Sequence, residues 1–307
     1  MWSTVLRRVL VTVPTVLAVV TVCFVLLHVT PGGPFDAERR VSPAVLANLQ
    51  AKYHLDQPLW RQYLFYLDSL VHGDLGASFR YADWSVNDLV AKALPVSLTV
   101  GGIAMAISLV AGVALGIVAA LRRNSAVDYG VMIVGSMGSA VPSFVLGPLL
   151  VLAFAIQVHW LPSGGWDDFA PRYMVLPVLL LTLINVAVIG RVMRGSLLEV
   201  LGENYIRTAR AKGLPMRVVV LRHAMRPALL PVVSLLGPLA ISSIASAIVT
   251  ETWFSLPGLG KLIVNGAANR DYTLVLGLVV LVTVLAVLLN LVVDLAYAWL
   301  DPRIRAA

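Results

Sequence analysis

Residues able to perform covalent or metal chemistry are present, but none stands in a catalytic pattern. Gly258–Leu262 resembles the end of a phosphate-binding loop, yet that motif requires Gly at position 255 and Ser or Thr after the lysine, where Ser255 and Leu262 stand. The chain has no Gly-x-Ser-x-Gly elbow for a nucleophilic serine. Its five histidines lack the spacings that hold a metal; they are His28, His54, His72, His159 and His223. The sequence therefore predicts neither an enzyme nor a resident cofactor.

A basic segment at 191–226 is suited to binding another protein. An apolar stripe at helical spacing precedes Arg210 and Lys212, and Gly213 can supply a left-handed helix stop. The stripe consists of Leu197, Leu198, Leu201, Tyr205 and Ala209. Pro215 can begin a second short helix, Met216–His223. The sequence thus predicts a helix, a tight turn and a helix.

Two interpretations of this segment differ in the partner that it would bind. A DNA-binding helix-turn-helix has a similar size and charge. Long apolar runs flank the segment on both sides, however, which favours a docking element for a cytoplasmic protein at a membrane surface. We expect no nucleic-acid partner.

Polar residues inside the apolar runs are the other candidates for function. Ser136, Ser139, Ser143 and Asn185 could line a polar path through a membrane, or small residues in these runs could simply allow close helix packing, as at Gly112 and Gly116. Asp294 closely follows the last run. A structural pair with an arginine is favoured over a proton relay for this carboxylate.

The elements that position these residues are membrane helices. Apolar residues make up 59% of the 307 residues and charged residues only 13%, which leaves too little polar surface for a water-soluble core. A single cysteine, Cys23, excludes a disulfide framework. Six long runs lack Asp, Glu, Lys and Arg, and a bilayer core requires about 20 apolar residues per helix. The runs show no period-2 alternation, so the sequence predicts an all-α polytopic protein with six transmembrane helices.

The expected division of the chain follows from these runs. The six spans are predicted at 9–30, 96–121, 129–158, 173–193, 227–250 and 272–299. They leave a cytoplasmic N-terminus at 1–8, an outer segment at 31–95, a cytoplasmic loop at 194–226 and an outer loop at 251–271.

The distribution of Lys and Arg predicts the orientation. With the N-terminus in the cytoplasm, 14 of the 23 basic residues lie inside and nine outside, and six of those nine fall in the long 31–92 segment. Long segments are translocated largely regardless of charge, so the 31–92 segment is left out of the comparison. The remaining segments then hold 14 basic residues on the inside and three on the outside. Both termini are therefore expected in the cytoplasm, and the net charge of +7 reflects topology.

Helix signals also occur in the outer segment. Pro58 can begin a helix over Leu59–His72, which Gly73 would end, and Ser85 and Asp88 form the pattern of a capping box. We expect a small helical cap on the outer membrane face, either as a lid or as a docking surface.

Several sequence blocks resemble one family of membrane proteins. Tyr205–Leu214, followed by Leu221–Ala224, is similar to the cytoplasmic loop of permease subunits from binding-protein-dependent ABC importers, in particular the B-type (DppB/OppB) subunit of dipeptide and oligopeptide systems. Arg207 stands at the usually acidic position of that loop motif, while Ala209 and Gly213 match it. Further similar blocks run in order along the chain: Tyr53–Leu59, Gly73–Gly76, Leu94–Leu98, Val141–Phe144, Glu251–Gly260 and Leu300–Arg305.

The resemblance implies a fold, a location and a set of partners. These are a type I ABC importer permease fold with its core at 95–295, in a bacterial inner membrane, beside a second permease subunit of the DppC/OppC type. Two ATPase domains of the DppD/DppF type would bind ATP and magnesium, and an extracytoplasmic binding protein would deliver the peptide. Nickel, glutathione or haem as cargo, a secondary transporter, and an intramembrane enzyme are the alternatives.

The resemblance also assigns the cytoplasmic loop the task of coupling to the ATPases. The residues expected to do so are Ala209, Gly213, Leu214, Pro215, Met216, Arg217, Val219, Val220, Arg222 and His223.

Overall fold

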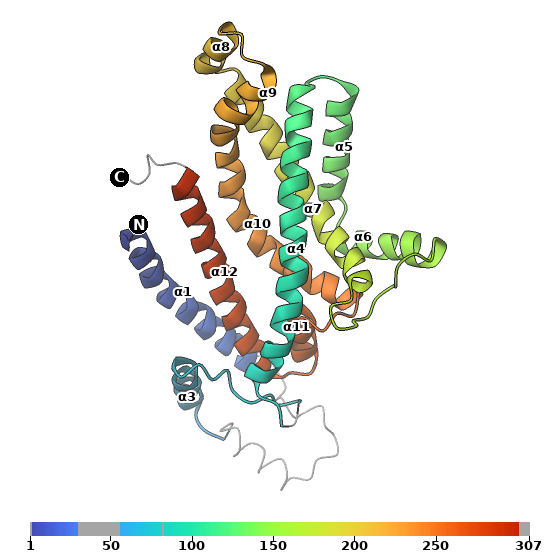
Figure 1. Ribbon diagram of the computed structural model, residues 1–307. Coiled ribbons are helices and arrows are strands. Elements are labelled where there is room, and N and C mark those ends of the chain that lie inside the picture. Colours follow the sequence, from blue (N-terminus) through green and yellow to red (C-terminus); the bar gives the residue numbers. More distant parts are fainter. Residues whose placement is uncertain (1, 30–55, 82, 301–307) are drawn as a thin grey trace.

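The computed structural model describes residues 2–29, 56–81 and 83–300, and within these ranges it is almost entirely helical (Figure 1). The helices are α1 Trp2–Val29, α3 Leu59–Val71, α4 Val86–Leu121, α5 Ala126–Ala140, α6 Ser143–Leu150, α7 Pro171–Leu201, α8 Asn204–Ala211, α9 Met216–Val218, α10 Met225–Trp253, α11 Leu259–Ala268 and α12 Tyr272–Leu300. Two π-helical segments, η1 Val151–Gln157 and η2 Val219–Ala224, follow α6 and α9. The part of the predicted outer cap between 31 and 55 lies outside the described residues, whereas its helix after Pro58 is present as α3.

Five helical segments of the described chain are long and apolar enough to cross a membrane. They are Thr12–Val29, Val86–Leu121, Pro171–Leu201, Met216–Trp253 and Tyr272–Tyr297. Five of the six expected runs are therefore continuous helices. The second one begins earlier than expected, at Val86 instead of 96, and passes through Pro95. The capping box explains this start, because the Ser85 side chain accepts from the Asp88 N–H while Asp88 accepts from the Ser85 N–H.

The third expected span, 129–158, is interrupted. α5 ends at Ala140, and α6 begins at Ser143 after Val141 and Pro142. The backbone of Pro142 is extended (φ −59°, ψ 144°). Proline has no N–H to continue the helix and holds the preceding residue out of the helical region. Figure 1 shows α6 turning away from the axis of α5. The structure thus corrects the expectation of one unbroken helix over 129–158.

Glycines allow α4 and α7 to pack closely. A Cβ on Gly112 would lie 2.7 Å from Ile189 Cβ, and one on Gly116 would lie 2.6 Å from Met193 Cβ and 2.7 Å from the Gly190 carbonyl oxygen. The packing role considered for these two glycines is therefore present. This close packing holds α7 against α4. The cytoplasmic segment follows directly after the end of α7.

A bidentate ion pair joins α5 to α7 at the cytoplasmic end. Arg194 Nε and Nη2 donate to Asp128 Oδ1 and Oδ2 at 2.5 and 2.7 Å. The Asn124 N–H donates to the same carboxylate at 2.9 Å, and Asp128 is only 2% exposed. This geometry makes charge-assisted hydrogen bonds strong and fixes their direction. The ion pair thus fixes the first turn of α5 to α7 at Arg194, next to Met193, which packs against α4.

The outer end is fixed by two buried carboxylates. Asp271 accepts from the Ser78 hydroxyl, from the Phe79 N–H at 3.1 Å and from the Leu274 N–H at 3.2 Å, and so joins residues 78–79 to the start of α12. Glu251, at the end of α10, accepts from the Ser97 hydroxyl at 2.6 Å and from the Gly260 N–H at 2.7 Å. Glu251 thus joins α10 to α4 and α11, and Asp271 fixes the start of α12 to the segment before α4.

The close packing of α4 on α7 predicts the effect of a single methyl group. Gly116→Ala should lower the free energy of unfolding by about 1–3 kcal/mol, the usual cost of overpacking, because backbone atoms of α7 lie in the way. Gly102→Ala on the same helix is the matched control, since no atom lies within 4 Å of its added Cβ. Thermal unfolding in detergent measures both. Equal melting temperatures for the two variants would contradict the packing described.

The ion pair predicts a second difference between matched variants. Asp128→Asn should cost about 2 kcal/mol, the size of hydrogen bonds to charged groups, because Arg194 loses its carboxylate. Asp167→Asn removes the exposed partner of Arg172, 3.4 Å away, and should cost less than about 1 kcal/mol. The comparison uses the same thermal unfolding measurement, and a larger loss at Asp167 would refute it.

Candidate functional site

The cytoplasmic segment 202–226 folds as the sequence predicts in its first half and differently in its second. α8 ends where Gly213 adopts φ +75°, the left-handed conformation that glycine tolerates best. Pro215 then precedes α9. The expected separate helix Met216–His223 is absent, because α9 continues through η2 directly into α10 as one helical segment, Met216–Trp253. The second half of the segment is thus the first part of the fifth span.

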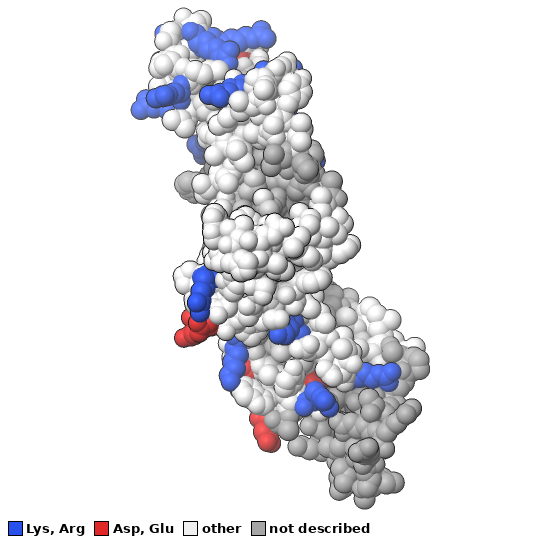
Figure 2. Space-filling model, turned by 90° about the vertical axis from the view of Figure 1, so that its right-hand side faces the viewer, with Lys and Arg blue, Asp and Glu red and all other residues white. Residues whose placement is uncertain are grey.

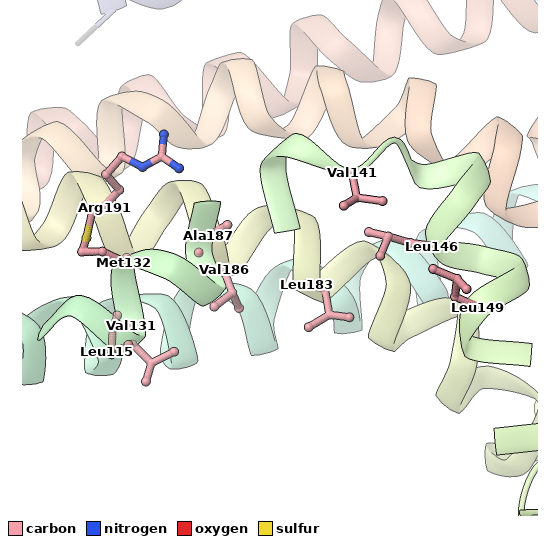
Figure 3. Close-up of a pocket in the computed structure, with 13 residues that line it drawn as sticks. Leu115, Val131, Met132, Val141, Leu146, Leu149, Leu183, Val186, Ala187 and Arg191 are labelled. Atoms are coloured by element: carbon pink, nitrogen blue, oxygen red, sulfur yellow. The ribbon is translucent and has the colours of Figure 1, made fainter. Parts of the chain in front are cut away.

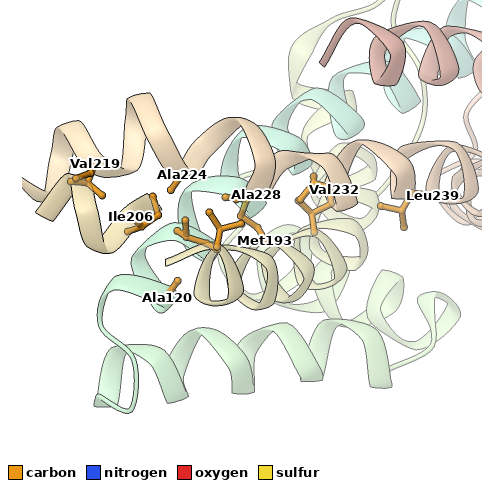
Figure 4. Packing of buried hydrophobic residues seen from close by; sticks show 12 residues of the cluster. Ala120, Met193, Ile206, Val219, Ala224, Ala228, Val232 and Leu239 are labelled. Carbon is orange, nitrogen blue, oxygen red and sulfur yellow. The ribbon is translucent and has the colours of Figure 1, made fainter. Parts of the chain in front are cut away.

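The underside of this segment is buried in its own chain. Ile206 and Val219 are fully buried, and Ala209 is 5% exposed. These side chains pack with residues of α4, α7 and α10 in what we call the inner cluster (Figure 4). Its members are Ala120, Ile189, Met193, Leu197, Val200, Ile206, Ala209, Val219, Ala224, Ala228, Val232 and Leu239. The segment is therefore packed onto the spans and does not hang from them as a loose loop.

The solvent-exposed side of the cytoplasmic segment carries basic residues and two exposed apolar side chains. Met216 is 42% exposed and Leu221 is 68% exposed. Five basic residues are exposed around them: Arg207, Arg210, Lys212, Arg217 and Arg222. Figure 2 shows Lys and Arg gathered at this end of the molecule, with little acidic surface beside them. Such a surface is complementary to an acidic protein partner with apolar pockets.

The structure separates the residues expected to couple to a partner. Val219 and Val220 are buried, at 0% and 4% exposure, so their side chains pack within this chain. Leu214 is half-buried and packs on the inner cluster, and His223 is half-buried with Nδ1 3.4 Å from the Val218 carbonyl oxygen. Gly213, Pro215, Met216, Arg217 and Arg222 are exposed.

Leu221 does not stand among the residues expected to couple to the ATPases, yet it is exposed on the same helical segment. It is the most exposed large apolar side chain of the segment. Its position between Arg217 and Arg222 was the available signal, but a helix period cannot tell which apolar residues of a short run face inward. Tyr205 of α8 is also partly exposed; partial burial and the nearby Glu203 carboxylate raise the pKa of its hydroxyl, which stays neutral at physiological pH.

The residues expected to line a path are placed in different surroundings. Asn185 is 3% exposed, and its Nδ2 donates to the Ser243 hydroxyl at 3.0 Å, which joins α7 to α10. Ser143 is half-buried at the start of α6. The side chains of Ser136 and Ser139 lie outside the described residues. Asp294 is half-buried on α12, and its pair with an arginine stays a prediction.

A pocket of about 540 Å³ lies at the elbow between α5 and α6 (Figure 3). Its lining comes from α4, α5, α6 and α7 and is almost wholly apolar: Leu115, Gly130, Val131, Met132, Gly135, Val141, Leu146, Leu149, Leu183, Val186, Ala187, Gly190 and Arg191. Arg191 is its charged member, at the end that leads to the cytoplasmic segment (Figure 3). Within the described part of the chain, no three His, Cys, Asp or Glu residues are grouped to hold a metal.

Comparison with known proteins identifies relatives along the whole chain. The family model "Binding-protein-dependent transport system inner membrane component" matches residues 112–306, and the model for the N-terminal part of such membrane components matches 1–100. The oligopeptide transport system permease protein OppB of Escherichia coli K12 is 51% identical over 301 residues, covering 98% of both chains. OppB of Haemophilus influenzae is 52% identical and covers 97% of this chain and 98% of its own.

A dipeptide permease and a solved transporter extend the comparison. The dipeptide transport system permease protein DppB of Bacillus subtilis is 42% identical over 95% of this chain and 94% of its own. The MetNI methionine ABC transporter, in an inward-facing conformation, matches with a TM-score of 0.60 and 18% identity over 69% of this chain and 96% of the matched chain, which shows a shared fold. The chain therefore belongs to the binding-protein-dependent transport system inner membrane component family, as a multi-pass inner-membrane permease subunit of an ABC importer.

Proposed function

We propose that this chain forms half of the translocation path of an importer for dipeptides or oligopeptides, and that its cytoplasmic segment couples the path to separate ATPase subunits. The names of the OppB and DppB relatives support the cargo class. The observation that carries the coupling role is the two-sided segment itself. Its buried side is part of the inner cluster. Its exposed side carries basic residues together with the exposed apolar side chains of Met216 and Leu221.

The surface that would contact the ATPases is the coupling face, which we define as Met216, Arg217, Leu221 and Arg222. All four side chains are exposed, and they lie on the helical segment that continues into the fifth span. A force applied there reaches α10 through a continuous helix and α7 through the inner cluster. Packed interiors respond to such a displacement by moving as blocks. The Asp128–Arg194 pair would extend the moving block to α5 and to the elbow at Val141.

The proposal requires several other proteins. A second permease subunit of the DppC/OppC type would supply the other half of the path. The apolar side chains of α6 and η1 offer it a surface, since Phe144, Leu149 and Ile156 are 52–58% exposed on a segment that leaves the bundle (Figure 1). Two ATPase domains would bind ATP and magnesium, because this chain lacks a phosphate-binding loop. An extracytoplasmic binding protein would deliver the peptide.

Transport by the assembled complex tests the function directly. Proteoliposomes containing this chain, the second permease subunit and the ATPases should accumulate radiolabelled trialanine only with ATP and the substrate-loaded binding protein present. A non-hydrolysable ATP analogue should abolish uptake. Uptake by this chain alone under a proton gradient would identify a secondary transporter instead, and uptake of nickel, glutathione or haem in place of peptide would change the cargo.

A pair of aspartate substitutions tests the two sides of the segment. Leu221→Asp should leave the chain folded but lower uptake about tenfold or more, because it places a charge in a desolvated contact worth at least 1.4 kcal/mol. Val219→Asp should instead prevent accumulation of folded chain, since the new carboxylate would be buried without a partner. Yield, melting temperature and peptide imported per ATP hydrolysed separate the outcomes. A Leu221→Asp complex with parental import per ATP would rule out the coupling face.

Charge reversal tests the electrostatic part of docking. Arg217→Glu with Arg222→Glu should weaken binding of the purified ATPases to the permease pair in nanodiscs and reduce the dependence of that binding on ionic strength. Arg172→Glu, on the exposed outer side of the membrane, is the matched control and should leave both unchanged. Undiminished ATPase affinity in the double variant would show that the basic residues do not take part.

A further inference from the structure

The short helix α3 lies at the outer end of the bundle, beside α1 and α12 (Figure 1). The Tyr63 hydroxyl is 2.6 Å from the Thr21 hydroxyl of α1, and its ring packs edge-on against Phe24 with ring centroids 5.2 Å apart. No residue of α3 is fully buried. One face of α3 is thus held by α1, and the rest of its surface is left for another environment.

The exposed surface of α3 is divided into two stripes. Trp60, Leu64 and Val71 are 59%, 54% and 84% exposed, and their spacing of four and seven residues places them on one face of a helix. Arg61, Asp68 and His72 have spacings of seven and four and form a neighbouring polar face. The side chains of His72 and Asp68 are 72% and 77% exposed, as expected for groups in water. Leu59 and Phe65, about half exposed, flank these stripes.

The apolar stripe continues a surface that faces lipid. On α1, Val22, Val25, Leu26 and Val29 are 50–72% exposed and recur every three or four residues. They belong to a segment that is long and apolar enough to cross a membrane, where exposed apolar side chains are suited to contact hydrocarbon. Thr21, which contacts α3, immediately precedes this row. The contact of Tyr63 with Thr21 therefore places α3 close to the exposed apolar row of α1.

We infer that α3 is an interfacial helix that inserts its Trp60, Leu64 and Val71 stripe into the outer leaflet of the bilayer. A helix of this kind lies in the membrane plane with its apolar face among the acyl chains and its polar face in water. Trp60 suits that boundary, because indole rings concentrate at the headgroup level. The Arg61 guanidinium lies 5.1 Å from the centroid of the Trp60 ring, which places a cation next to the lipid phosphates. Insertion of this stripe would then fix the position of α3 along the membrane normal.

Spin labelling of the assembled complex in nanodiscs of phosphatidylethanolamine and phosphatidylglycerol tests the inference. Single cysteines are introduced in a Cys23→Ser background at Leu64→Cys and Val71→Cys on the apolar stripe, and at Arg61→Cys and Asp68→Cys on the polar face as matched controls. Each labelled complex is checked for peptide uptake. The accessibility of the nitroxide to oxygen, which concentrates in lipid, is compared with its accessibility to a water-soluble nickel chelate.

The expected result is a several-fold higher ratio of oxygen to nickel accessibility at 64 and 71 than at 61 and 68. Preferential access of the nickel chelate to 64 and 71 would overturn the inference, because the stripe would then face water. Low access of both reagents at 64 and 71 would also overturn it, since the second permease subunit or the binding protein would then cover the stripe. Neither result bears on the coupling face, which is tested separately at the other side of the membrane.

Discussion

Burial of one side of the cytoplasmic segment against α7 and α10 is the constraint on which the rest of the structure depends. Ile206, Ala209 and Val219 join the inner cluster, so the position of the segment is tied to that of two spans. If the segment were solvated on all sides, a partner could move it without moving the membrane helices. The close contact of α4 with α7 through Gly112 and Gly116, and the ion pair from α7 to α5, extend the same connection to the other side of the bundle.

Both ends of the molecule are held by polar groups within an otherwise apolar protein. Asp128 at the cytoplasmic end and Glu251 and Asp271 at the outer end are each at most 2% exposed, and each accepts several hydrogen bonds. Buried carboxylates are tolerated where their oxygens are satisfied. Between them, Asn185 donates to the Ser243 hydroxyl and joins α7 to α10, and Gly112 and Gly116 allow α4 and α7 to pack closely. Directional contacts therefore hold the bundle at both ends and also in its middle.

Features set by local chemistry could be predicted from the sequence. The helix after Pro58, the capping box at Ser85 and the stop at Gly213 each depend on a few neighbouring residues, and all three are present. Features set by tertiary contacts could not. Val219 and Leu221 lie two residues apart in one apolar run and so point to opposite sides of the helix; Val219 is fully buried and Leu221 68% exposed because the side that carries Val219 packs with Ile206 and Ala209 of α8. The break at Val141 was also missed, because a charge-free run of 30 residues is long enough to span without one.

The π-helical segment η2 has a consequence for how related chains should be compared. A π-helix accommodates one residue more than an α-helix in a similar length, so it acts as an insertion wound into the helix. At 3.6 residues per turn, one residue corresponds to a rotation of about 100°. The direction in which Leu221 points is thus offset from the pattern of buried residues further along α10. A homologue that lacks this one residue and has an α-helical turn here would present a different side to the cytosol, even where the flanking residues are the same.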